Sequence, residues 1–269
     1  GYMVFYIRKE LMNMCDKGDY AEFTSALIPG CNNIIGIRQP VLKKYAKQLV
    51  SENNDFRKLL EEPDIYHEET LLRSYIIGIG TAKEKDFEKA LSDMEAFVPL
   101  VNNWAVNDSF CVEFKIMDAF RDEFKPYIWK YTESGDEYTA RVGLIMLLDH
   151  YLKVDKNGNR KPRMKKVTIK DLYNTAYAKD SRIIEGMYID DILKLVNRDY
   201  TKNGYYTQMA AGWLLAECFV TFPQRTWEYL TDSDNMKLDR VSYKKAIRKI
   251  CESLTPEKEV KAKVKELLQ

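Results

Sequence analysis

Apolar residues recur every third or fourth position along most of the chain. The stretches ETLLRSYIIGIG (residues 69–80) and YTARVGLIMLLDHYL (residues 138–152) carry this spacing, which is typical of helices with one buried face. In VLKKYAKQLV (residues 41–50) the same spacing puts apolar residues on one side and lysines on the other. Pro40 precedes that run and suits the first turn of a helix. The pattern predicts helices throughout.

Helix-breaking residues such as Pro29-Gly30, Pro63-Asp64 and Asn203-Gly204 follow one another at short intervals. Strand-like alternation is nearly absent, so we expect a dozen or more short helices in an all-α fold. Stacked helix pairs of the α-solenoid kind, within one domain spanning residues 1–269, fit this pattern best. No repeated consensus is visible, so the repeats would be degenerate, and a globular helical bundle is the alternative. Small residues in YYTQMAAGWLLAECFV (residues 205–220) indicate close helix packing.

One segment departs from this pattern. Residues 153–170 (KVDKNGNRKPRMKKVTIK) hold eight Lys or Arg and one acid, Asp155. The local balance is +7; since the whole chain carries +1, the remainder carries −6. Asn157-Gly158 is a strong hairpin turn signal. We expect a basic insertion over residues 153–183, either a hairpin or a loop projecting from the helices. It either binds a polyanion or is simply solvated.

The remaining composition limits the chemistry. With a net charge of +1, only a local basic patch can argue for nucleic acid binding. The five cysteines form no CxxC pair, so neither a zinc site nor a disulfide scaffold is suggested, and two histidines are too few for a His-based metal site to be expected. The motifs GxxxxGK[ST], GxGxxG, GxSxG and HExxH are absent. The sequence shows no membrane span or signal peptide, and a reducing cytoplasm fits the cysteine pattern.

The stretch NNWAVNDSF (residues 102–110) mixes an indole and a carboxylate on one helical face. Trp104 and Asp108 are four residues apart, so in a helix they point the same way. By residue type alone, Trp104 is more often core and Asp108 more often solvated. A ligand that meets both groups is the other interpretation.

Three stretches carry a resemblance to a known family. They are GIRQPVLKKYAKQL (residues 36–49), NNWAVNDSFC (residues 102–111) and YYTQMAAGWLLAECFVTFP (residues 205–223). HEETLLRSYIIG, EYTARVGLIMLLDHYL and KKAIRKICES match in order around them. Together they resemble the AlkD-like DNA alkylation repair family of bacterial glycosylases, which are built from HEAT-like helical repeats. The resemblance covers roughly residues 3–268, and the basic insertion is long for the family.

The resemblance implies a concave, positively lined surface that holds duplex DNA. We expect a monomeric enzyme that needs neither a metal nor an organic cofactor. Members hydrolyse the N-glycosidic bond of cationic alkylated purines such as 3-methyladenine and 7-methylguanine. They grip the backbone that bears the lesion without a deep base pocket.

The resemblance also assigns roles to single residues. Asp108 matches the catalytic carboxylate, Trp104 and Trp213 match the two aromatic walls, and Arg141 matches the arginine that holds backbone phosphate. Some active members have an arginine where this chain has Ala216. We expect further DNA contacts from basic residues of the first stretch, the insertion and the last stretch. These are Lys43, Lys44, Lys47, Arg160, Lys161, Arg163, Lys165, Lys166, Lys244, Lys245 and Arg248.

Two other functions remain open at this stage. Ala216 and the basic insertion favour a non-catalytic HEAT-repeat protein that binds branched or damaged DNA. Solenoid architecture alone is also typical of scaffolds that bind proteins. Each residue has a structural alternative as well: Arg141 as the ion-pair partner of a neighbouring helix, and the lysines as a solvated face.

Overall fold

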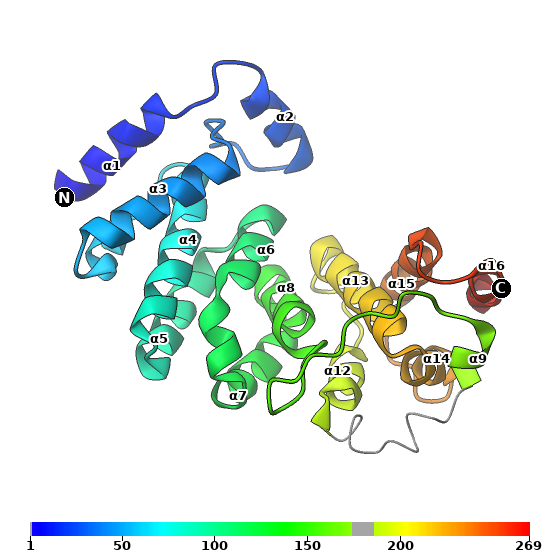
Figure 1. Cartoon of the computed structure of the whole chain (residues 1–269). Coiled ribbons are helices and arrows are strands. Elements are labelled where there is room, and N and C mark those ends of the chain that lie inside the picture. The colour runs from blue at the N-terminus through cyan, green and yellow to red at the C-terminus, as the bar shows by residue number, and fades with distance from the viewer. Residues whose placement is uncertain (1, 174–185) are drawn as a thin grey trace. The chain divides into compact units, whose positions relative to one another are not determined.

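The computed structural model describes residues 2–173 and 186–269, and its regular structure is helical (Figure 1). In these residues β pairing is limited to isolated bridges, so the predicted all-α class is confirmed. The chain divides into two compact units, Gly1–Phe120 and Arg121–Gln269, which are described separately. A single domain over residues 1–269 stays a prediction. In the described ranges we find no helix with the length and apolar character that crossing a bilayer requires.

The first unit centres on α4, which packs against α3 and α6. Its helices are α1 (Tyr2–Asn13), α2 (Tyr20–Leu27), α3 (Gln39–Glu52), α4 (His67–Glu84), α5 (Phe87–Phe97) and α6 (Trp104–Glu113). Contacts join the starts of α4 and α6 through His67 and Asn103, and their middles through Ser74 and Ser109. The two helices therefore run side by side in the same direction.

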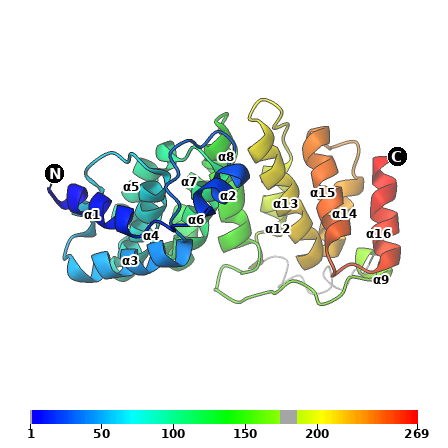
Figure 2. The same cartoon turned by 90° about the horizontal axis from the view of Figure 1, so that it is seen from above.

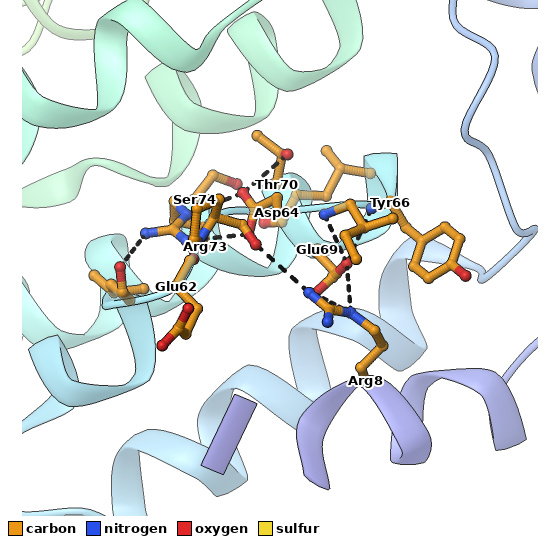
Figure 3. A network of polar contacts seen from close by, with 12 residues as sticks. Arg8, Glu62, Asp64, Tyr66, Glu69, Thr70, Arg73 and Ser74 are labelled. Carbon is orange, nitrogen blue, oxygen red and sulfur yellow. Dashed lines mark hydrogen bonds and ion pairs between the residues drawn. The ribbon is translucent and has the colours of Figure 1, made fainter. Parts of the chain in front are cut away.

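The start of α4 is tied down by arginine–carboxylate contacts (Figure 3). Arg8 of α1 donates to Glu69, with Nη2 3.0 Å from Oε2. Arg73 donates to Asp64 just before the helix, and the Thr70 hydroxyl donates to the same carboxylate. Glu69 also accepts from backbone N–H groups that precede the helix. These bonds satisfy N–H groups that no helix can pair internally, and so they fix where α4 begins.

The second unit repeats the arrangement of parallel helices. Its helices are α7 (Arg121–Thr132), α8 (Glu137–Met146), α9 (Ile169–Tyr173), α12 (Ile189–Val196), α13 (Tyr205–Thr221), α14 (Pro223–Thr231), α15 (Arg240–Glu252) and α16 (Lys258–Lys265). α13 packs between α8 and α15 (Figure 2), while α7, α14 and α16 pack against α8, α13 and α15. Side chains join the start of α8 to the start of α13, and the start of α13 to the start of α15. The three inner helices therefore share one direction.

Glycine permits the close approach of α4 and α6. The backbone carbonyl of Glu113, at the end of α6, lies so near Gly78 that a Cβ on this glycine would overlap it. A backbone atom cannot swing aside as the end of a flexible side chain does. An added methyl group must therefore push the two helices apart.

We expect Gly78→Ala to lower the free energy of unfolding by about 1–3 kcal/mol, the usual cost of overpacking a core. Gly135 has no atom within 4 Å of its Cβ position and no positive φ. The control Gly135→Ala should therefore stay within about 0.5 kcal/mol of the parent protein. Urea unfolding of both variants measures the difference. Equal free energies of unfolding in the two variants would contradict the close approach of α4 and α6 at Gly78.

Candidate functional site

The stretch that carries Trp104 and Asp108 is α6, and a buried asparagine fixes its start. The Asn103 side-chain oxygen accepts from the Val106 N–H at 3.0 Å, which is an N-terminal cap. The amide nitrogen of Asn103 lies 3.3 Å from Nδ1 of His67 in α4. Because the amide oxygen is already bound to Val106, the nitrogen is the group that faces His67. The cap therefore joins the two helices at the residue before Trp104.

Trp104 and Asp108 are both partly exposed, whereas Asn107, Ser109 and Phe110 between and beyond them are buried. Their four-residue spacing thus places both on the open side of α6, as the sequence predicts. The Trp104 indole Nε1 donates to the Leu27 carbonyl at 3.0 Å, which anchors the ring to the end of α2. The indole is held in place, but its catalytic role stays a prediction.

Stacked aromatic side chains beneath α6 hold this helix rigidly. The rings of Phe97 and Phe110 have centroids 4.5 Å apart, and those of Phe110 and Phe114 are 5.0 Å apart. All three side chains are essentially inaccessible to solvent. Such a packed cluster resists rotation of the helix, so the direction of its open face is set.

The predicted basic residues of α3 differ in their partners. Lys43 forms an ion pair with Glu113 of α6, with Nζ 2.9 Å from Oε1. Lys44 and Lys47 are exposed and make no ion pair with any described residue. Phosphate contacts therefore fit Lys44 and Lys47 better than Lys43.

In the second unit, α8 grips the first turn of α13. Arg141 is only 6% exposed, and its Nη1 donates to the Tyr206 carbonyl at 2.8 Å. The Glu137 carboxylate accepts from the Tyr206 N–H at 2.9 Å, and the Glu137 carbonyl accepts from the Thr207 hydroxyl at 2.6 Å. Arg141 therefore joins two inner helices, and its expected phosphate contact stays a prediction.

Trp213 is partly exposed in the third turn of α13, next to a close contact between α13 and α15 at Gly212. A Cβ on the adjacent Gly212 would come within 2.6 Å of the Lys245 Cγ and 3.0 Å of the Ala246 nitrogen. The close packing predicted from the small residues is therefore confirmed here. Ala216, three residues further on, is buried at 8% exposure. An arginine at that position would need different neighbouring side chains.

The basic insertion begins as predicted and continues differently. Residues 155–159 form a tight turn closed by the Val154–Arg160 bridge, with Gly158 at φ 83°. Residues 161–168, called here the strap, then run along the protein instead of projecting. Their backbone bonds to Val220 at the end of α13 and to Thr255 after α15. Residues 174–183 of the predicted insertion lie outside the described residues.

The expectation of a projecting loop is thus wrong for the strap, because carbonyl, hydroxyl and carboxylate groups bind its cations. Lys161 Nζ donates to the Thr221 carbonyl at 2.8 Å, and burial lowers the pKa of its amine. Arg163 donates to the Ser253 and Thr255 hydroxyls. Lys166 forms an ion pair with Glu257 at 2.6 Å, and Lys153, which precedes the turn, forms one with Glu217 at 3.3 Å. Arg160 and Lys165 are exposed.

The outer side of α15 carries the last predicted cations. Lys244 and Arg248 lie one turn apart, are exposed and make no ion pair with any described residue. Lys245 is partly buried, since its stem packs on Gly212. From Arg240 to Cys251 the helix contains no acidic residue. It therefore offers an open positive face.

The structure brings the candidates together in pairs. Trp104 and Asp108 share the open side of α6 in the first unit, and Arg141 contacts the helix that carries Trp213 in the second. Sequence reasoning missed the supporting residues His67 and Asn103; the asparagine directly before an amphipathic run was the available signal. Among the described residues, we find no cluster of His, Cys, Asp and Glu that could hold a metal ion.

Comparison with known proteins gives one finding on the family. Residues 7–250 match the sequence profile of a family described as DNA alkylation repair enzyme. No curated protein matches the chain.

The buried His67 makes stability depend on pH. Burial lowers the pKa of this imidazole, while the neighbouring Glu68 carboxylate opposes the shift. Within the described residues its buried Nε2 has no hydrogen-bond partner. In the unfolded chain a histidine titrates near pH ~6.5, so below that pH the unfolded state binds more protons than the folded state. The contribution of His67 to the free energy of unfolding is therefore fully present above pH ~6.5 and is lost as the pH falls.

We expect the free energy of unfolding to decrease between pH ~6.5 and pH 5 with a slope of up to ~1.4 kcal/mol per pH unit from this residue. His67→Gln should be less stable at neutral pH but should lack that part of the slope. Urea unfolding at a series of pH values gives both quantities. Identical slopes in the two proteins would show that His67 is not the responsible group.

Proposed function

The chain belongs to the DNA alkylation repair enzyme family, and on that premise we propose that it is a DNA glycosylase. Its substrates would be cationic alkylated purines in duplex DNA, with 3-methyladenine and 7-methylguanine as representatives. The observation that carries the proposal is the family match over residues 7–250 together with the partly exposed Trp104 and Asp108 on one rigid helix. The alkylation repair family itself implies binding to DNA.

The proposed reaction is hydrolysis of the N-glycosidic bond. An alkylated purine carries a positive charge, so when the bond to C1′ breaks it leaves with the bonding electron pair as a neutral base. Positive charge then develops on the sugar, as in an oxocarbenium ion. Water adds to C1′ and loses a proton, which leaves an abasic sugar. Because the leaving group is already cationic, little general-acid help is needed.

Asp108 is the proposed stabiliser of the developing positive charge and the group that orients the attacking water. Trp104, fixed by its bond to Leu27, offers an aromatic face that attracts the cationic sugar. Trp213 is the proposed second aromatic wall. A preorganised site of this kind needs side chains that do not reorient during the reaction, and the cap at Asn103 and the phenylalanine stack supply that rigidity.

The proposed DNA backbone contacts lie on one helix of each unit, α3 and α15. Lys44 and Lys47 of α3 and Lys244 and Arg248 of α15 are exposed cations without ion-pair partners among the described residues. Positive side chains of this kind bind phosphate by releasing counterions. Arg141 is proposed to hold phosphate as the resemblance implies, in addition to its bond to Tyr206.

The alternative of a branched-DNA binder depended on a projecting basic segment. In the structure Lys153, Lys161, Arg163 and Lys166 are engaged by groups of the second unit. This removes much of the charge that the segment was expected to offer DNA. Glycosylase activity is therefore the proposal we favour.

Replacing Asp108 by asparagine keeps the shape and removes the negative charge. We expect Asp108→Asn to slow release of 7-methylguanine and 3-methyladenine from methylated duplex DNA by roughly 10²- to 10³-fold, with DNA binding retained. Asp19→Asn is the matched control in the same unit, since Asp19 is exposed and makes no side-chain cap bond. The control should have normal activity. If the unaltered protein binds this DNA yet releases neither base, the glycosylase proposal is wrong.

The cations of α15 can be tested by salt titration. Lys244→Ala and Arg248→Ala should each weaken duplex binding, and each should reduce the slope of log K against log salt by about one. Lys166→Ala is the control, because Lys166 already pairs with Glu257. If neither Lys244→Ala nor Arg248→Ala changes the slope, the DNA does not contact these residues of α15.

A further inference from the structure

The side chains of α13 that reach solvent form one stripe. They are Tyr205, Tyr206, Met209, Trp213 and Glu217. After the adjacent pair Tyr205 and Tyr206, intervals of three or four residues keep the rest on the same side of the helix, and every other residue of α13 is buried. Trp213 therefore does not stand alone, because aromatic side chains occupy the same stripe two turns before it.

Tyr206 is held from three directions by α8. Its N–H donates to Glu137, its carbonyl accepts from Arg141, and its ring stacks on Tyr138 with centroids 6.0 Å apart and an interplanar angle of 27°. Burial, helped by the Glu137 carboxylate, raises the pKa of Tyr138 to about 12, so this ring stays neutral. Helices α8 and α13, which supply these groups, lie side by side (Figure 2). Tyr206 thus forms a fixed backing.

Tyr205 packs against that backing and remains open on the other side. Its ring meets Tyr206 edge-on, with centroids 5.1 Å apart and planes at 90°. Yet Tyr205 is 59% exposed. We call Tyr138, Tyr205 and Tyr206 the aromatic ledge.

An unpaired nucleobase suits the open ring best. Stacking on an aromatic side chain is a general way to hold single bases, and it needs no hydrogen-bond pattern. The ledge shares its stripe with Trp213, the proposed wall beside the sugar, and an exposed cation, Lys202, lies three residues before Tyr205. At the far end of the stripe the carboxylate of Glu217 is neutralised by Lys153. The stripe therefore carries no open negative charge that would repel DNA.

We propose that the aromatic ledge binds an unpaired nucleobase of the DNA by stacking it on Tyr205. This proposal rests on the proposed function, since it requires DNA along α13. It adds a site for a base that has lost its partner, distinct from the groups that break the glycosidic bond. Arg141 gains a positioning role, because it holds the carbonyl of Tyr206 behind the ledge.

The test compares two duplexes of one sequence that contain 2-aminopurine. In the first, 2-aminopurine faces thymine and is paired; in the second, it faces a tetrahydrofuran abasic analogue and is unpaired. Binding is measured by anisotropy and stacking by quenching of 2-aminopurine fluorescence. The proteins are the parent, Tyr205→Ala, Tyr205→Phe and the control Tyr173→Ala. Tyr173 is exposed to a similar extent in the same unit and contacts Lys263.

We expect the parent to prefer the unpaired duplex by about fivefold or more, in line with the stacking of one base on one ring, and to quench its fluorescence. Tyr205→Phe and Tyr173→Ala should keep both effects, and Tyr205→Ala should lose both. A Tyr205→Ala protein that keeps the preference and the quenching would overturn the ledge while leaving the proposed function intact. A parent protein that binds neither duplex would overturn the ledge, whereas the release of methylated bases decides the proposed function separately.

Discussion

Acceptors shared between neighbouring parallel helices are the interaction on which both units depend. The first N–H groups of a helix have no partner within it, and here the helix beside it takes part in their capping. Asn103 caps α6 while it contacts α4, and Glu137 of α8 accepts from the Tyr206 N–H of α13. Asp239 caps α15 and also accepts from Gln208 of α13. Each bond sets the start of one helix against the start of the next, so the helices stay parallel and in register.

This constraint determines which residues are available for function. Trp104 and Tyr205 both lie in the first turn of their helix and both reach solvent. Trp104 follows its capping asparagine directly, and Tyr205 precedes the residue that α8 grips on both its N–H and its carbonyl. Hydrogen bonds of the neighbouring residues, Asn103 and Tyr206, therefore help to fix where these two aromatic rings lie, in addition to the contacts of the rings themselves. A bound sugar or base would then meet surfaces that are already ordered, which reduces the entropy lost on binding.

The features that could be predicted from the sequence are those that depend on local periodicity. Features that depend on hydrogen-bond acceptors far along the chain could not be predicted. The helical class, the turn at Asn157-Gly158 and the shared face of Trp104 and Asp108 follow from spacing within a few residues. The burial of Arg141 does not, because the carbonyl it binds belongs to Tyr206, 65 residues further along. The strap was missed for the same reason, since its partners at and after the ends of α13 and α15 are backbone carbonyls and side chains far along the sequence.

The strap also shows why the densest run of positive charge need not be the surface that binds a polyanion. The end of a helix carries unpaired carbonyl groups and a partial negative charge. Two such ends, those of α13 and α15, lie along the strap, and Glu217 and Glu257 add full charges. Lysines and arginines placed there stabilise the folded state by neutralising this negative charge. The cations with charge to offer DNA are then those on α3 and α15 that face no acid, although their stretches are less conspicuous in the sequence.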